Sequence, residues 1–301
     1  MRAILFPGLD SLFVASKIKR WLDFDFIKQS LNETSLKLSE LTNQSEDLLA
    51  FIRDTHRPYL VDLDRSLVCL TVLQVSIATN LKNKITDLGL IQGCSHGDIA
   101  RSVMVESISL NDAIEILWSF TFLRKLLPDG VTATVRTKDG TPISEAHVAW
   151  LKAEDTPISL WSKEHGTIGA ETHKIDLLSK VAVERNLKIK NMLPFPVHTP
   201  ALMPAIELLR KTSDLWPVSA PKHGTVSSVW VRDIASAQEL KDEVLAGAIQ
   251  PVRWIETLDY LYHERKIREF INIGPSNTLT SWVFESNQYP ELKVIEAWDL
   301  L

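Results

Sequence analysis

The chain has 301 residues, about twice the commonest domain size, and its 45% apolar and 24% charged residues describe a folded globular protein. Its net charge of −5, with basic residues scattered along the sequence, argues against nucleic acid or an anionic membrane as a partner. The two cysteines argue against a disulfide framework, and the sequence shows neither a signal-peptide pattern nor a run of about 20 apolar residues, so we expect a cytoplasmic protein.

The first 130 residues alternate short strands with helices. An apolar run over residues 3–6 predicts a strand, which a Pro-Gly pair ends. Residues 68–81 are apolar nearly all round, which is typical of a buried helix. A short buried strand is predicted over 87–91, and helices are predicted over 98–107 and 111–127. This alternation favours an α/β fold.

The pattern changes after residue 130. Residues 131–137 alternate at the period of a strand, and the sequence Lys-Asp-Gly then predicts a hairpin-type turn. Segments 147–151 and 158–162 are predicted as two further strands, and 177–185 as a helix. Together these elements indicate a small α+β unit.

We interpret this unit as an insertion into a larger fold. Strand and helix patterns resume after residue 200 and end with a strand over 270–273. We therefore assign residues 131–194 to a small lobe, and residues 1–130 and 195–301 to one larger α/β body.

The sharpest local signal is the sequence Gly-Cys-Ser-His-Gly at residues 93–97, a G-x-S-x-G pattern between a predicted strand and a predicted helix. Small residues on both sides let the chain turn sharply, which projects the hydroxyl of Ser95 above the sheet edge. The following helix directs backbone N–H groups and its positive dipole end at the same point. Ser95 is therefore the candidate nucleophile.

A serine hydroxyl is a weak nucleophile and needs a base. Among the eight histidines, His198 lies in segment 194–200, where three prolines would hold the loop stiff. A lone loop histidine is more often a solvated surface residue, so the loop alone does not decide its role. Cys94, His96 and Asp98 alternate like metal ligands on a strand, but this stretch turns into a helix, so we expect no metal site.

Four segments in order resemble the malonyl-CoA:acyl carrier protein transacylase family of fatty-acid and polyketide synthesis. Residues 6–11 resemble its FPGQGSQ motif, and residues 93–98 resemble GHSLGE. Residues 198–205 resemble the segment that begins at the catalytic histidine, and residues 273–280 resemble an IGPGNVLTG-like motif. Their spacing covers nearly the whole chain, so coincidence is a poor explanation.

The resemblance implies an α/β-hydrolase-like body with a parallel sheet and an inserted ferredoxin-like lobe. Ser95 would attack a thioester while His198 takes its proton, with the backbone N–H groups of Leu9 and His96 as the oxyanion hole. The carbonyl that orients the histidine would lie near Gly247. The resemblance also implies an acyl carrier protein as partner, a coenzyme A or phosphopantetheine thioester as substrate carrier, and no bound cofactor; we expect a monomer.

The sequence departs from the family at its acyl pocket. An arginine that holds the malonyl carboxylate in the family aligns with Phe120, which offers no donors. The histidine that usually precedes the nucleophile is Cys94 here. Both changes make the pocket less polar and disfavour malonyl groups, unless Arg124, one turn further along the helix, replaces the lost arginine.

Four functions stay open at this point. The first is acyl transfer on carrier-protein thioesters with a non-malonyl group, in polyketide or specialised lipid synthesis. The second is hydrolysis of acyl groups from blocked carrier proteins, and the third is malonyl transfer with Arg124 as the relocated clamp. The fourth is an inactive docking homologue, against which the presence of both Ser95 and His198 argues. The basic stretch 180–190 is a candidate carrier-protein contact, although such a run is more often a solvated helix face.

Overall fold

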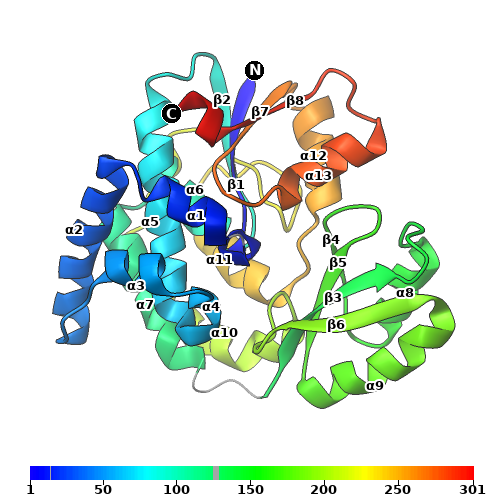
Figure 1. Ribbon diagram of the computed structural model, residues 1–301. Helices are drawn as coiled ribbons and strands as arrows, with labels where there is room; N and C mark the ends of the chain where they lie inside the picture. The colour runs from blue at the N-terminus through cyan, green and yellow to red at the C-terminus, as the bar shows by residue number, and fades with distance from the viewer. Residues whose placement is uncertain (14, 125–128) are drawn as a thin grey trace.

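A parallel sheet forms the centre of the larger part of the fold (Figure 1). A computed structural model describes residues 1–13, 15–124 and 129–301. The four strands lie in the order β2-β1-β7-β8 and every neighbouring pair is parallel. Their bounds are β1 Arg2–Phe6, β2 Leu88–Gly93, β7 Glu269–Asn272 and β8 Lys293–Glu296. The strands predicted over 3–6, 87–91 and 270–273 therefore exist, with ends shifted by up to two residues.

Strand β1 shows how the sheet separates two hydrophobic cores. Its side chains alternate between the faces, so Ile4 and Phe6 belong to one buried cluster and Ala3 and Leu5 to the other. The first cluster includes helix α5 (Leu63–Lys82), and the second includes α12 (Trp254–His263). Both faces of the sheet are thus covered, as parallel sheets require.

Helix α6 (Gly97–Met104) follows β2 at once, and α7 (Leu110–Arg124) follows α6. The predicted helices 98–107 and 111–127 correspond to these two, although residues 125–127 lie outside the described part of the chain. The other α-helices of this larger part are α1 Ala15–Trp21, α2 Asp25–Thr42, α3 Leu48–Asp54, α4 Pro58–Val61, α10 Met203–Ser213, α11 Ala237–Ile249 and α13 Thr278–Ser286. Short 3-10 turns span Leu9–Phe13, Pro200–Leu202 and Ala297–Leu300.

A second, antiparallel sheet lies beside the first, at the lower right of Figure 1. Its order is β4-β5-β3-β6, with bounds β3 Val131–Thr137, β4 Ser159–Leu160, β5 Gly166–Ala170 and β6 Leu187–Leu193. Helices α8 (Glu145–Ala153) and α9 (Thr172–Ala182) accompany it, and a 3-10 turn follows over Val183–Arg185. The predicted α/β class, with a parallel sheet and a separate antiparallel sheet, is confirmed.

One predicted strand of this region is wrong. Residues 147–151 lie inside helix α8, because Ser144 and His147 form a reciprocal capping box that starts a helix there. Trp150 and Leu151 are buried by the helix against the second sheet. A five-residue apolar run fits either a strand or one helical turn, so only the cap distinguishes them.

All four strands of the second sheet fall between residues 131 and 193. We therefore propose the division into a lobe of residues 131–194 and a body of residues 1–130 and 195–301. Within the described ranges, no helix is long and apolar enough to cross a membrane.

Candidate active site

The turn between β2 and α6 places Ser95 at the carboxyl edge of the parallel sheet. Ser95 has φ +57°, a left-handed conformation that a non-glycine residue rarely adopts. A Cβ on Gly97 would lie 2.0 Å from the carbonyl oxygen of Phe6, so only glycine fits between the helix start and β1. The G-x-S-x-G pattern thus produces the sharp, strained turn that exposes a serine hydroxyl.

His198 lies against Ser95 although 103 residues separate them in the chain. Its Nε2 is 2.8 Å from Ser95 Oγ, and its Nδ1 is 2.5 Å from the carbonyl oxygen of Gly247 on α11. A carbonyl can only accept, so Nδ1 carries the proton and donates it to Gly247. Nε2 is then left with the lone pair that accepts the Ser95 hydroxyl proton.

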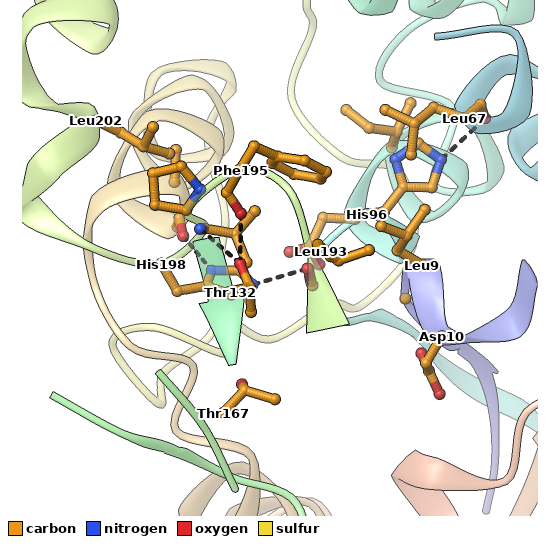
Figure 2. A pocket seen from close by; sticks show the side chains of 18 of the residues that line it. Leu9, Asp10, Leu67, His96, Thr132, Thr167, Leu193, Phe195, His198 and Leu202 are labelled. Atoms are coloured by element: carbon orange, nitrogen blue, oxygen red, sulfur yellow. Dashed lines mark hydrogen bonds between the residues drawn. The ribbon is translucent and has the colours of Figure 1, made fainter. Parts of the chain in front are cut away.

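Two neighbours hold the loop that carries His198. The hydroxyl of Thr132 on β3 donates to the carbonyl of Phe195 and accepts from the N–H of Val197 (Figure 2). On the other side, the N–H of Thr199 donates to the carbonyl of Ala248 on α11. The histidine is therefore fixed between the second sheet and the helix that orients its ring.

Burial lowers the pKa of His198, and the hydrogen bond to Gly247 opposes this in part. A lowered pKa keeps the imidazole neutral at neutral pH, which is the form that can accept a proton. The Ser95–His198–Gly247 arrangement can therefore activate a hydroxyl nucleophile without a carboxylate.

The backbone N–H groups expected to form an oxyanion hole belong to Leu9 and His96, which both line the cavity at Ser95. Among the described residues neither N–H has a hydrogen-bond partner, so both can donate to a ligand. The side chain of His96 points elsewhere, since its Nε2 lies 3.0 Å from the carbonyl of Leu67 (Figure 2), and burial lowers its pKa to about 4. The imidazole of His96 is therefore neutral and forms part of the cavity lining.

The cavity at Ser95 has a volume of about 290 Å³ and lies between the body and the second sheet. Its lining is mainly apolar, and three carboxyl groups reach it, those of Asp10, Asp98 and Glu243. Within the described residues no lysine or arginine lines it. The side chain of Asp10 accepts hydrogen bonds from Ser276 and Thr278, while burial raises its pKa. The cavity thus offers acidic and apolar surface.

The sequence analysis missed a buried charged cluster behind this lining. Arg101 on α6 is fully buried, with Nη2 2.6 Å from Glu243 Oε2 and Nη1 3.4 Å from Asp98 Oδ1. Burial of Asp98 raises its pKa. Asp98 and Arg101 lie three residues apart on a helix that must pack against a sheet, and this spacing is the sequence signal for an ion pair between them. Glu243 lies 142 residues after Arg101, and the sequence contains no signal that it is a partner.

The remaining predicted pocket residues have different outcomes. Phe120 lines the cavity, next to Leu117 on α7. Cys94 is not among the residues that line the cavity: it is fully buried in the same cluster as Ala3 and Leu5. Successive side chains around the strand end point to opposite sides, so a residue next to an outward serine faces the core. The side chain of Arg124 lies outside what the structure describes.

No set of three or more His, Cys, Asp or Glu side chains within the described ranges is arranged to hold a metal ion. Burial raises the pKa of the Cys94 thiol well above its usual value, which keeps it protonated and unreactive.

No family model matches the chain. A malonyl CoA-acyl carrier protein transacylase of Bacillus subtilis is 21% identical over 99% of this chain and 93% of its own. Among solved structures, the transacylase of Coxiella burnetii is similar with a TM-score of 0.83 and 19% identity over 98% of this chain and 93% of its own. An acyltransferase domain of the salinomycin polyketide synthase reaches 0.79 at 18% identity, over 98% and 68%.

A further similar structure is a malonyl-transacylase in complex with a type II polyketide synthase acyl carrier protein, with a TM-score of 0.80, 18% identity and coverage of 98% and 95%. The chain is therefore similar in sequence to a malonyl CoA-acyl carrier protein transacylase along almost its whole length, and it shares the fold of such proteins.

Proposed function

We propose that this protein is a serine-dependent acyltransferase that acts on acyl carrier protein thioesters and uses an acyl group without a carboxylate. The observation that carries the proposal is the hydrogen-bonded series from Ser95 to His198 to the Gly247 carbonyl. A hydroxyl on a strained turn, with a neutral, oriented base at 2.8 Å, has the geometry that acyl transfer needs.

In the first half-reaction Ser95 Oγ bonds to the thioester carbonyl carbon while its proton passes to His198 Nε2. The carbonyl oxygen becomes an oxyanion, which the N–H groups of Leu9 and His96 stabilise. The carbon–sulfur bond then breaks, and the leaving thiolate takes the proton from His198. The product is an ester on Ser95 and a free thiol.

In the second half-reaction the thiol of another pantetheine arm gives its proton to His198 and attacks the ester. The bond to Ser95 Oγ breaks, and that oxygen recovers the proton from His198. The serine and histidine return to their starting state, and the acyl group leaves on the second carrier.

The charges at the cavity support the proposal of an acyl group without a carboxylate. Phe120 provides no hydrogen-bond donor where a carboxylate-binding arginine is expected, and the lining already holds three carboxyl groups. Among the described residues a malonyl carboxylate there would find no cationic partner, and its desolvation would cost several kcal/mol. A non-carboxylated acyl group avoids that cost.

An acyl carrier protein is the proposed partner, since one of the similar malonyl-transacylase structures is a complex with such a protein. Lys180, Lys188 and Lys190 are exposed on the second sheet and its helix and could contact its acidic surface. The similarity to polyketide synthase proteins supports a place in polyketide or specialised lipid synthesis.

Intact-protein mass spectrometry tests this proposal. Purified protein is incubated with malonyl-, acetyl- and hexanoyl-loaded carrier protein, beside Ser95→Ala and the exposed-site control Ser45→Ala. We expect the acetyl or hexanoyl mass on the wild type and on Ser45→Ala, and no adduct on Ser95→Ala. Adduct formation with malonyl alone would refute the non-malonyl assignment, and no adduct with any donor would refute the enzyme.

The fate of the adduct separates transfer from hydrolysis. When a carrier protein with a free pantetheine thiol is added, transfer predicts loss of the mass from Ser95 and its appearance on the acceptor. Decay to free acid at the same rate without an acceptor would show that the protein is a hydrolase.

A further inference from the structure

The segments that line the cavity differ in the uncharged groups that they contribute. The second sheet and the C-terminal region contribute the polar Thr167, His165 and Thr278 beside apolar side chains, namely Trp161, Met192, Leu193 and Leu279. The helices α6, α7, α10 and α11 contribute mostly aliphatic and aromatic side chains. A pantetheine arm carries amide groups that need polar partners, whereas the helical side offers few. The two sides therefore suit the two ends of an acyl thioester.

The helical side consists of side chains that are almost fully buried in the body. Ile99 on α6, Leu117 on α7, and Ile206 and Leu209 on α10 retain between 3% and 7% of their surface exposed, and all line the cavity. Contact with water stabilises such a surface little, whereas contact with an apolar ligand is favourable. The occupant must therefore bring apolar surface of its own.

The two carboxyl groups on this side already have a cationic partner. Glu243 and Asp98 both face Arg101, which does not itself line the cavity. An acyl group that carried a carboxylate would meet these two acidic groups and no accessible cation among the described residues. An uncharged chain meets no such penalty.

The volume sets a scale for the chain. An engineered apolar cavity of about 150 Å³ holds benzene, so the whole cavity of about 290 Å³, which must also receive the thioester and part of the pantetheine arm, has space for an aliphatic chain of several carbons. An acetyl group would leave most of the helical side unfilled. Unfilled apolar space loses dispersion contacts and favours a longer occupant.

Among the described side chains, Phe120 is the bulkiest that the four helices place at this side of the cavity. Its ring lies 6.4 Å from that of Trp216 in an edge-to-face arrangement, and both rings pack against the apolar clusters formed around α10 and α7. A second, smaller cavity of about 20 Å³ lies beyond Ile99 and Val244 and is lined by Trp216. Ile99 and Val244 line both cavities, and the Phe120–Trp216 pair lies beside them, with one ring at each cavity.

We infer that the helical side of the cavity is a binding site for an aliphatic acyl chain of medium length, and that Phe120 limits how long this chain can be. The inference rests on the proposed function, because it names the acyl group that Ser95 would carry. It adds a substrate class and a residue that determines specificity.

The test measures the rate of Ser95 acylation with saturated acyl-carrier-protein donors from two to fourteen carbons. Each buried methylene contributes about 0.8 kcal/mol, so the rate constant at low donor concentration should rise about fourfold per added methylene until the site is full, and then fall. In Phe120→Ala the optimum should move to a longer chain, since the ring that limits the length is gone.

Leu208→Ala is the matched control, because Leu208 lies on α10 but is 42% exposed and does not line the cavity. It should keep the wild-type optimum. Leu209→Ala, on the cavity side of the same helix, should move it as Phe120→Ala does. Circular dichroism of each variant checks that it is folded.

The outcomes separate the two proposals. If Ser95 is acylated but acetyl reacts as fast as any longer chain, or if the optimum is unchanged in both cavity variants, the chain site is refuted and the acyltransferase stands. If no donor acylates Ser95 in the wild type, the proposed function itself is refuted.

Discussion

The catalytic corner and the helical side of the same cavity place different demands on the sequence. At the corner, Ser95, His198 and the Gly247 carbonyl must meet within hydrogen-bond distance, and the sequence marks this with a strained turn and a proline-rich loop. On the helical side, Phe120 and its neighbours need only be apolar and of suitable size. Geometry that chemistry demands leaves a pattern in the sequence, whereas a surface that only has to fit a chain leaves almost none.

The largest expected effect concerns the corner. We expect His198→Ala to slow Ser95 acylation by a factor of about 10² to 10⁴, because the hydroxyl loses its base. Stopped-flow or quenched mass spectrometry measures this rate, and His56→Ala, at an exposed histidine, should retain the wild-type value. Equal acylation rates for His198→Ala and His56→Ala would mean that His198 is not the base for Ser95.

The second prediction concerns the buried ion pair between Arg101 and Glu243. Glu243→Gln removes the charged partner of fully buried Arg101, which should lower the free energy of unfolding by about 3 kcal/mol in urea titrations. Glu256→Gln, in an exposed pair with Arg253, should cost less than about 1 kcal/mol. A similar small loss for both would show that the buried pair adds no stability.

The third prediction is a pH profile. Burial lowers the pKa of His198, and only the neutral ring can accept the serine proton. Acylation should therefore rise about tenfold per unit as pH increases below that pKa, and should reach its plateau at a pH lower than the ordinary histidine value of about 6.5 predicts. A midpoint above 6.5 would contradict the assignment of His198 as the buried base.

The smallest expected effect belongs to Cys94. Because the thiol is buried in the core and does not line the cavity, Cys94→Ala should change acylation less than about twofold and cost about 1 kcal/mol of stability, measured by thermal unfolding. A large change in chain-length preference in Cys94→Ala would mean that Cys94 does contribute to the acyl pocket.

These particular residues show how far the sequence leads. Ser95 and His198, together with the placement of a carbonyl near Gly247, follow from local motifs and a family resemblance. Glu243 could not be predicted as the partner of Arg101, because the contact joins two helices that are far apart in the chain. Segment 147–151 was misassigned because its apolar run fits two periodicities, and only the cap at Ser144 decides between them.

Helix α7 supplies Leu117 and Phe120 to the cavity but none of the three groups at the catalytic corner. Those come from the β2–α6 turn, the loop after β6 and helix α11. Helix α7 therefore belongs to the proposed acyl-chain side alone, whereas α11 lines that side and also carries the Gly247 carbonyl. A library of variants confined to the cavity-facing positions of α7 would explore new acyl groups while leaving the reacting groups in place.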